Sequence, residues 1–241
     1  IAIHDTTLGP ACGGVRVWPH PTEEGAIFDV LRLARAMTYK SAAAGLPLGG
    51  GKALIWANPY TDKSKELLRA FGRCVENLDG RYITTEDVGI TPVDLEHIAE
   101  ETSHIVGLPT SKGGGGDTSP LTGQGVYLGM KACAMALWGS DSLEGRVVAM
   151  QGFGNVGTQA AQHLLQEGVT LVVTDIHEGA VDRARRLGAS VVEPEAIYDT
   201  ECDIFSPCAL GGVLNSKTIS RLRCSIVAGG ANNQLLYESA G

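Results

Sequence analysis

The sequence predicts a two-domain α/β protein, in which an N-terminal α/β domain precedes a doubly wound, Rossmann-type parallel-sheet domain. Strand-like and helix-like segments alternate along the chain, and four glycines at 113–116 interrupt this alternation. A Gly-x-Gly-x-x-Gly motif starts at Gly152, directly after a strand-like run. With 241 residues, 44% of them hydrophobic, the chain can bury two cores, so we place the domains at 1–116 and 117–241.

Composition and charge exclude several classes of partner. The chain carries 19 basic and 27 acidic residues, so its net charge of −8 gives no general attraction to nucleic acid or an anionic membrane. No apolar run reaches the roughly 18 residues of a membrane span, and the first residues do not form a signal sequence. We therefore expect a soluble, cytoplasmic protein that acts on small molecules. The start at Ile1, without a methionine, suggests a trimmed chain.

Neither the cysteines nor the histidines form a recognisable metal site. The six cysteines are scattered without Cys-x-x-Cys spacing, which favours reduced thiols in a chain large enough to fold without disulfides. The six histidines are isolated in the sequence. We therefore predict no metal.

The first domain is predicted to open with strands at 1–3 and 15–18, on either side of an ordered glycine-rich loop at 6–14. A helix follows from 23 to 40. A later helix is predicted to begin at Thr91, a capping residue that a first-turn proline follows. The first helix is expected to bury one apolar stripe, made of Ile27, Val30, Leu31, Ala34 and Met37.

The stretch from Lys40 to Lys52 has the composition of a catalytic site. Small apolar residues and a triple glycine separate the two lysines. Burial among such residues lowers the pKa of a lysine toward the range where it exchanges protons at neutral pH. The glycines allow a sharp turn and a close approach of a ligand to Lys52, which borders a strand predicted at 53–57. A surface turn with solvated lysines is the alternative interpretation.

Three further residues of the first domain are candidates for the same site. Asp87 is predicted at the end of a strand, where an aspartate is commonly a cap or a solvated loop residue. Beside two lysines it becomes a candidate proton shuttle. Gly13 and Gly14 can offer backbone N–H groups to an anion such as a carboxylate, and a tight turn explains them equally well.

The glycine motif of the second domain is the most specific signal in the chain. It follows a strand predicted at 146–151 and opens a helix whose N-terminus can receive a pyrophosphate. A second strand at 169–173 ends beside Asp175, which can accept hydrogen bonds from both ribose hydroxyls of NAD and repel the 2′-phosphate of NADP. We favour NAD, although His177 could contact a phosphate. The motif comprises Gly152, Phe153, Gly154, Asn155, Val156 and Gly157.

Other segments of the second domain are less specific. Asn232 and Asn233 follow the last predicted strand on the carboxyl side of the sheet, where ligands bind, and an Asn-rich turn is the alternative. The glycines at 113–116 indicate a hinge, because the Gly-Lys-Ser/Thr of a phosphate-binding loop does not follow them. A helix from Thr122 is expected to bury a face made of Val126, Met130, Cys133 and Leu137.

Several motifs occur in a known order: Gly-Pro-Ala-Cys-Gly-Gly, Thr-Tyr-Lys, Gly-Gly-Gly-Lys, Thr-Glu-Asp-Val-Gly, Gly-Phe-Gly-Asn-Val-Gly and Ala-Asn-Asn-Gln-Leu. In these motifs, and over nearly its whole length, the chain resembles the leucine, phenylalanine and valine dehydrogenases of the glutamate dehydrogenase superfamily. The resemblance implies reversible oxidative deamination of an L-amino acid to a 2-oxo acid and ammonia, with NAD as hydride acceptor. It also implies a homo-oligomer, a dimer or an octamer.

The resemblance assigns roles to the candidates in the first domain. Lys40 would bind the substrate carboxylate with help from the backbone of Gly13 and Gly14. Lys52 would be the catalytic lysine that activates water against the imine. Asp87 would exchange protons with the substrate nitrogen and water. Lysine and aspartate suit these tasks, because imine hydrolysis needs a base poised near neutral pH and a second proton carrier.

The resemblance also bears on the cofactor and on substrate selectivity. Thr122 and Asn232 would lie near the nicotinamide carboxamide, with Asn233 beside the substrate. Cys12 stands where the family usually has a larger apolar residue, so we expect a roomy apolar pocket and a substrate such as Leu, Val, Ile or Phe. One alternative is a non-catalytic NAD-binding protein of the same fold. The other, an NADP-linked glutamate dehydrogenase, would need more positive charge at the substrate and a non-acidic residue at 175.

Overall fold

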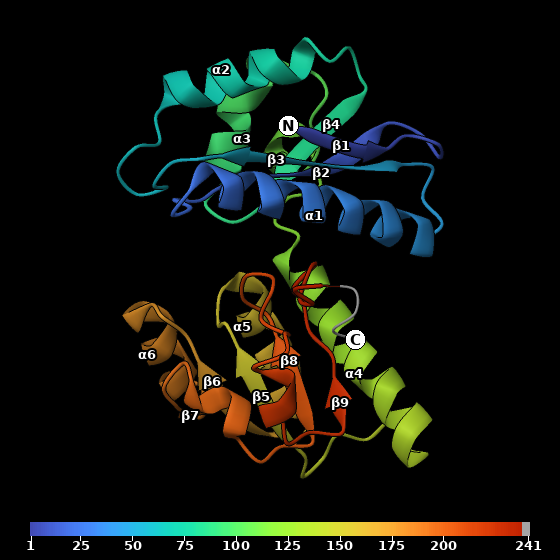
Figure 1. Cartoon of the computed structure of the whole chain (residues 1–241), viewed down its shortest axis with the longest axis vertical. Coiled ribbons are helices and arrows are strands. Elements are labelled where there is room, and N and C mark those ends of the chain that lie inside the picture. Colours follow the sequence, from blue (N-terminus) through green and yellow to red (C-terminus); the bar gives the residue numbers. More distant parts are fainter. Residues whose placement is uncertain (238–241) are drawn as a thin grey trace. The chain divides into compact units, whose positions relative to one another are not determined.

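The computed structural model describes residues 1–237, which divide into two compact units (Figure 1). The first unit is Ile1–Asp117, and the second begins at Thr118. Both units combine helices with a mostly or wholly parallel sheet, which confirms the predicted α/β class. The division into a substrate domain and a cofactor domain stays a prediction.

The first unit contains β1 (Ala2–Asp5), β2 (Ala11–Val17), α1 (Glu23–Ala43), β3 (Gly49–Ile55), α2 (Lys65–Glu76), β4 (Tyr82–Glu86), α3 (Pro92–Ala99) and a short 3-10 helix, η1 (Thr110–Lys112). Its sheet has the order β1-β3-β2-β4. β1 is antiparallel to β3, while β2 runs parallel to both β3 and β4. Figure 1 shows α1 on one side of the sheet and α2 and α3 on the other.

The helices of the first unit begin at side-chain caps. The Thr22 hydroxyl accepts a hydrogen bond from the Gly25 N–H at 3.1 Å, and Ser64 caps α2 in the same way. At α3, Thr91 and Asp94 form a reciprocal capping box, with a proline in the first turn. The predicted start of this helix is confirmed.

The glycine-rich segments of the first unit are strands, where the sequence predicted a loop and a turn. Gly13 and Gly14 lie in β2, and the triple glycine lies in β3, so Lys52 is inside a strand and not at its edge. The reason is close packing: a Cβ on Gly50 would collide with the backbone and hydroxyl of Thr38 in α1. Glycine here serves the approach of a helix to a sheet, not a bend.

The buried face of α1 also differs from the predicted stripe. Ala26, Leu33 and Ala34 are buried, whereas Ile27 and Leu31 are 50% and 56% exposed. Small side chains are favoured on the inner face because α1 lies so close to β3. The helix was predicted correctly, and Ala34 of the predicted stripe is buried, but the prediction was wrong for Ile27 and Leu31.

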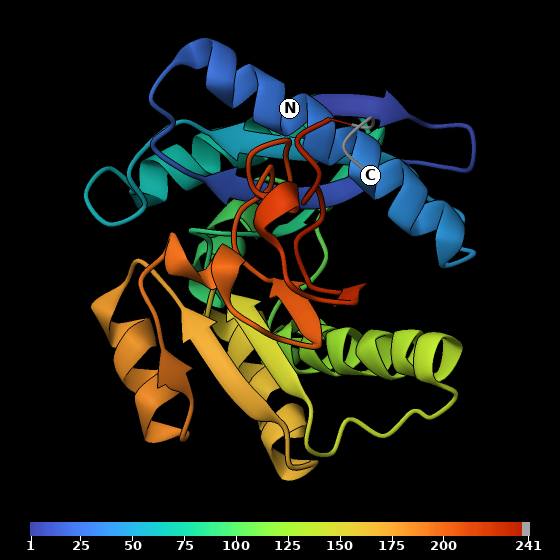
Figure 2. The same ribbon diagram turned by 60° about the horizontal axis from the view of Figure 1, so that its bottom comes forward.

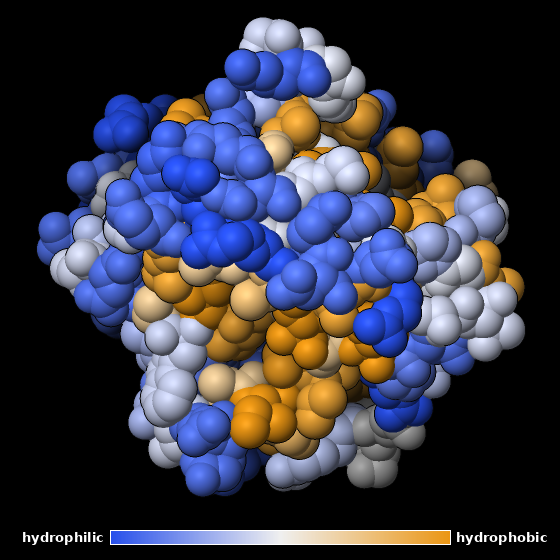
Figure 3. All heavy atoms as spheres, turned by 90° about the horizontal axis from the view of Figure 1, so that it is seen from above, coloured by the Kyte–Doolittle hydropathy of each residue, from blue (hydrophilic) through white to orange (hydrophobic). Residues whose placement is uncertain are grey.

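The main core of the first unit lies on the other side of the sheet. Side chains of α2 and α3 pack there against the strands. The largest fully buried side chains of this core are Tyr82 of β4, Leu68 of α2, and Leu95 and Ile98 of α3. The outer face of α2 is charged, and Lys65 and Arg69 pair with Glu100 and Glu101. Figure 3 looks at the molecule from above and shows a band of hydrophilic side chains between hydrophobic patches.

The second unit is an α/β unit with an entirely parallel sheet in the order β7-β6-β5-β8-β9. Its elements are α4 (Ser119–Trp138), β5 (Val147–Gln151), α5 (Asn155–Gln166), β6 (Thr170–Thr174), α6 (Glu178–Arg186), β7 (Ser190–Val191), the 3-10 helix η2 (Ala196–Asp199), β8 (Ile204–Pro207), the 3-10 helix η3 (Ile219–Arg221) and β9 (Ile226–Val227). In Figure 2 the yellow and orange arrows of β5 and β6 lie side by side. The predicted strand-helix-strand around the glycine motif is confirmed.

Two apolar clusters fill the second unit. The larger joins α4, α5 and α6 to the strands, and it contains Val126, Met130, Ala160, Leu164 and Ala184. The smaller joins η2 to Phe205 and Leu214. The predicted buried face of α4 holds at Val126 and Met130, but Leu137 is 55% exposed near the end of that helix.

Candidate functional site

The candidate catalytic side chains of the first unit come from neighbouring parallel strands. Lys52 projects from the middle of β3 and is 3% exposed, while Asp87 directly follows β4. β2 lies between these strands and pairs with both. Parallel pairing therefore brings together a lysine and an aspartate that are far apart in sequence.

A chain of polar contacts connects these residues. Lys52 Nζ lies 3.1 Å from Asp87 Oδ2, and Arg16 Nε donates a hydrogen bond to the same oxygen at 2.9 Å. Arg16 Nη1 donates to Asp29 Oδ2 at 2.8 Å, and His20 Nε2 is 3.4 Å from that oxygen. Within residues 1–237, Asp87 Oδ1 has no hydrogen-bond partner in the protein.

The environment shifts the pKa of both residues of the pair. Burial lowers the pKa of Lys52, with help from the charges of Arg16 and Lys40, and Asp87 only partly opposes this. Burial alone would raise the pKa of Asp87, but the cations of Lys52 and Arg16 outweigh it, so that pKa is lowered. Asp87 is thus held as an anion beside a lysine that gives up its proton more readily than usual.

Cys12 and Lys40 lie in the same electrostatic neighbourhood. Burial raises the pKa of the Cys12 thiol, while the charges of Lys52 and Lys40 oppose this rise. Lys40 is exposed in the last turn of α1. The predicted residues of the first domain are therefore gathered around Lys52.

The strand glycines shape the space beside the ion pair. A Cβ on Gly14 would lie 2.8 Å from the Cβ of Asp87 and would collide with the Glu86 carbonyl, so glycine alone fits there. The Gly13 carbonyl accepts a hydrogen bond from the Tyr82 hydroxyl at 2.6 Å. Both glycines have strand partners in β4, Thr84 and Thr85.

Sequence reasoning missed Arg16 and Asp29. Arg16 is 6% exposed and stands between Val15 and Val17, which are 0% exposed. A charged residue inside an apolar strand was the available signal, because a buried guanidinium requires partners. Its partners come from α1 and from the end of β4, and no local spacing could identify them.

The glycine motif of the second unit has the geometry of a dinucleotide-binding turn. Gly152 has a φ of +94°, and a Cβ there would lie 2.6 Å from the Ala209 nitrogen. Gly154 is the N-cap of α5, and a Cβ on Gly157 would lie 2.5 Å from the Gly152 carbonyl oxygen. The first glycine therefore makes the turn and the last permits close packing of helix and strand, as dinucleotide binding requires.

Asp175 is tied to this turn. Its Oδ2 accepts a hydrogen bond from the Phe153 N–H at 2.7 Å, and its Oδ1 accepts one from the His177 N–H at 2.9 Å. Each carboxylate oxygen can accept a further bond. Arg183, which the sequence did not single out, donates to the Phe153 carbonyl at 2.6 Å and to Thr158 at 3.0 Å, and so braces the turn.

The remaining candidates also belong to the second unit. Thr122 lies in the first turns of α4 and donates its hydroxyl to the Thr118 carbonyl at 2.9 Å. Asn232 and Asn233 follow β9, and Asn233 is 9% exposed with its side chain against Gly211. Because Asn233 and Lys52 belong to different units, the role of Asn233 at the substrate stays a prediction.

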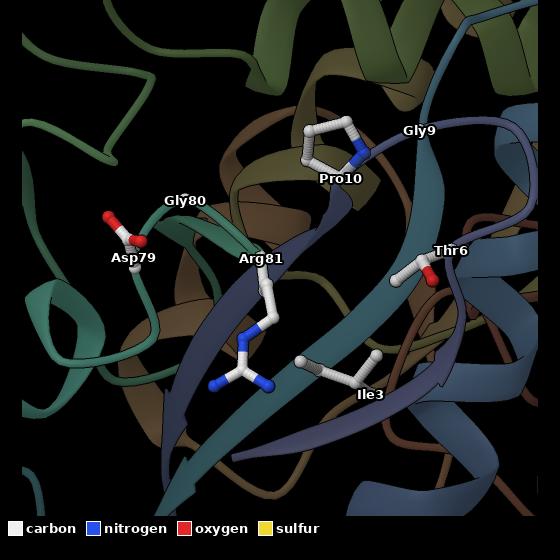
Figure 4. Close-up of a pocket in the computed structure, with 7 residues that line it drawn as sticks. All are labelled: Ile3, Thr6, Gly9, Pro10, Asp79, Gly80 and Arg81. Atoms are coloured by element: carbon white, nitrogen blue, oxygen red, sulfur yellow. The ribbon is translucent and has the colours of Figure 1, made fainter.

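A surface hollow of about 530 Å³ is not part of this site (Figure 4). It lies at the amino ends of β2 and β4, where Pro10 and Arg81 border it, whereas Asp87 follows the carboxyl end of β4. Between residues 1 and 237, no cluster of three His, Cys, Asp or Glu side chains could hold a metal ion. None of the described helices is both long and apolar enough to cross a membrane.

Sequence profiles of two related domains match the chain. "Glu/Leu/Phe/Val dehydrogenase, dimerisation domain" matches residues 1–104, and "Glutamate/Leucine/Phenylalanine/Valine dehydrogenase" matches residues 113–187. The leucine dehydrogenase of Bacillus subtilis is 54% identical over 98% of this chain and 65% of its own length. The L-tryptophan dehydrogenase of Nostoc punctiforme is 53% identical over 99% of this chain and 67% of its own length. The chain thus spans about two thirds of the length of these relatives.

Solved structures show the same likeness. A crystal structure of L-tryptophan dehydrogenase from Nostoc punctiforme matches with a TM-score of 0.69 and 50% identity, over 98% of this chain and 67% of the other. The Leu-bound hetero-hexameric glutamate dehydrogenase from Thermus thermophilus matches with a TM-score of 0.76 and 26% identity, over 96% of this chain and 62% of the other.

Proposed function

The chain belongs to the Glu/Leu/Phe/Val dehydrogenase family, and we propose that it catalyses the reversible, NAD-dependent oxidative deamination of an apolar L-amino acid. The amino acid, water and NAD would give a 2-oxo acid, ammonium, NADH and a proton. Relatives named leucine, tryptophan and phenylalanine dehydrogenase, each more than 50% identical, support an apolar substrate.

The observation that carries this proposal is the buried Lys52 beside Asp87. Imine hydrolysis needs a base that can take a proton from water near neutral pH, and burial lowers the pKa of Lys52 toward that range. It also needs a carrier for the protons of the departing nitrogen. Asp87 suits that role, because its Oδ2 is held by Lys52 and Arg16 while its Oδ1 has no partner among the described residues.

Substrate binding is assigned to residues around this pair. Lys40, exposed at the end of α1, would bind the carboxylate through its charge. Gly13 and Gly14 would assist Lys40 through their backbone, and Gly14 lets β2 pack closely against the residue that carries the Asp87 carboxylate. Cys12 would line an apolar part of the pocket, and Asn233 is a further proposed substrate contact.

The glycine turn fits a nicotinamide dinucleotide. The positive φ of Gly152 and the tight contacts of Gly157 leave no room for side chains, and the N-terminus of α5 offers N–H groups to a pyrophosphate. Bound NAD would accept the hydride from the substrate α-carbon. Residues 152–157 would hold the pyrophosphate, while Thr122 and Asn232 would contact the nicotinamide carboxamide.

Asp175 favours NAD over NADP. Its oxygens already accept hydrogen bonds from the Phe153 and His177 N–H groups, which fix the carboxylate beside the turn. Fixed there, the carboxylate would accept hydrogen bonds from the ribose hydroxyls of NAD and repel the 2′-phosphate of NADP. The same residue argues against an NADP-linked glutamate dehydrogenase, and the buried Lys52–Asp87 pair argues against a non-catalytic protein. We further propose a homo-oligomer, dimeric or octameric, in the cytoplasm.

A steady-state substrate panel tests this proposal. The full-length protein would be assayed with Leu, Val, Ile, Phe, Trp and Glu, each with NAD and with NADP. We expect NADH formation with at least one apolar amino acid at a higher kcat/KM than with Glu. Preference for Glu over every apolar amino acid would reject the substrate class, and no turnover with any of them would reject the enzymatic function.

A further inference from the structure

Arg16 is a buried cation that lies between two carboxylates of the first unit. It projects from β2, is 6% exposed, and contacts Asp87 through Nε and Asp29 through Nη1 at 2.9 and 2.8 Å. Neither contact is local, because Asp29 belongs to α1 and Asp87 follows β4. One planar guanidinium on β2 therefore connects α1 to the residue that follows β4.

We propose that Arg16 is a positioning residue for the deamination proposed above, with Asp29 as its anchor. Arg16 and Lys52 both contact Asp87 Oδ2, so two cations from adjacent strands fix that oxygen and orient the carboxylate. The other oxygen, Oδ1, is then available to exchange protons with the substrate nitrogen. Arg16 itself does not touch the substrate.

The geometry of the contact requires arginine. The guanidinium is a rigid plane, so holding Nη1 on Asp29 fixes the direction in which Nε donates to Asp87. A lysine at this position would keep the charge, but its three donors share one rotating nitrogen, so it would not fix the direction of each hydrogen bond as a rigid plane does. Arg16→Lys therefore separates the effect of charge from the effect of orientation.

The charge of Arg16 also acts on both members of the pair. It lowers the pKa of Lys52 through repulsion and the pKa of Asp87 through attraction and a hydrogen bond. Loss of this charge should raise both values. The charged or titratable groups that face the pair from β2, from α1 and from the segments beside them are Cys12, His20, Asp29, Lys40 and Tyr82.

The experiment compares Arg16→Gln, Arg16→Lys and the control Arg73→Gln in the full-length protein. Arg73 is an exposed arginine of α2 that also pairs with a carboxylate, Glu101. Three properties are measured for each variant: kcat and KM as functions of pH, the thermal midpoint, and the pH dependence with which an acylating reagent labels Lys52, read by mass spectrometry. The labelling reports the Lys52 pKa without any turnover.

We expect Arg16→Gln to lower kcat by about 10- to 100-fold, the scale of a misplaced catalytic group, with KM nearly unchanged. Both limbs of its pH profile and its Lys52 labelling curve should move to higher pH. Arg16→Lys should restore the position of the limbs but not kcat, and Arg73→Gln should match the wild type. Arg16→Lys keeps the cation, so it decides the question even if Arg16→Gln does not fold.

The positioning role is overturned if kcat falls only in proportion to the folded fraction while the pH limbs and the Lys52 labelling stay at their wild-type positions. Full kcat in Arg16→Lys would also overturn it, since orientation would then not matter. If the wild type oxidises no amino acid, the proposed function fails. The Lys52 labelling curve then still tests whether Arg16 lowers the pKa of Lys52. An unchanged labelling curve in Arg16→Gln then overturns its effect on Lys52.

Discussion

Replacing Lys52 by methionine tests the catalytic site most sharply. The lysine is 3% exposed in β3, so truncation to alanine would open a cavity and confuse loss of function with loss of packing. Methionine is also long, unbranched and adaptable. It removes the titrating nitrogen while filling most of the space, and it leaves Asp87 its contact with Arg16 at 2.9 Å.

The expected loss of turnover follows from the role of a general base. Such groups contribute about 10²- to 10⁴-fold, which corresponds to about 2.7 to 5.5 kcal/mol of activation free energy. NAD binding should persist, because the glycine turn belongs to the second unit. The assay is steady-state NADH formation, with NAD affinity measured separately by calorimetry.

The pH dependence of the free energy of unfolding gives a second test of Lys52. Burial lowers the pKa of Lys52 in the folded state, so the unfolded chain binds more protons at this residue than the folded chain does. The wild type therefore loses stability as the pH falls from the unfolded lysine value of about 10.4 through the lowered folded value. A pKa difference of one is worth about 1.4 kcal/mol. Lys52→Met lacks this loss, so its thermal midpoint should rise relative to that of the wild type as the pH falls through this range.

Two results would refute this reasoning. Turnover of Lys52→Met within about threefold of the wild type would show that Lys52 is not the base, since a general base contributes far more. A thermal midpoint well below that of the wild type, with the same difference at every pH, would show that the lysine stabilises the fold through its contact with Asp87. A thermal midpoint that rises relative to that of the wild type toward lower pH, together with loss of turnover, would support the account.

Three further variants test the assigned roles. Lys40→Ala should chiefly raise the KM for the amino acid, because its contact with the carboxylate exists in the ground and transition states alike; an unchanged KM would remove it from the site. Asp175→Ser should weaken the binding of NAD and improve the use of NADP, and an unchanged ratio of kcat/KM for the two cofactors would contradict the assignment of Asp175 to the ribose. Cys12→Leu should penalise the bulkiest accepted substrates by about 1–3 kcal/mol of transition-state free energy, and equal scaling of kcat/KM for Val and Phe would show that Cys12 does not line the pocket.

Periodic and capped segments could be predicted from the sequence. The start of α3 at Thr91 and the strand-helix-strand around Gly152 both follow from local patterns, because caps and dinucleotide turns have short-range signatures. The triple glycine could not be assigned in the same way. Its conformation depends on how closely α1 approaches β3, which is a tertiary contact.

The same reason limits prediction of the candidate site. Lys52 and Asp87 are suggestive in sequence because their neighbours indicate burial and a strand end. Arg16 carries no such signal beyond its charge, and its two carboxylate partners become visible only when β2, α1 and the end of β4 are placed together. The exposure of Ile27 is likewise decided by which face of α1 meets the sheet.

Product stoichiometry tests the central claim most directly. The full-length protein would be given a limiting amount of the best apolar amino acid from the panel and excess NAD, and NADH, 2-oxo acid and ammonia would each be quantified. The account predicts equal amounts of the three products with the wild type and none with Lys52→Met, although that variant still binds NAD. NADH without equivalent ammonia, or undiminished products from Lys52→Met, would contradict oxidative deamination at the Lys52–Asp87 pair.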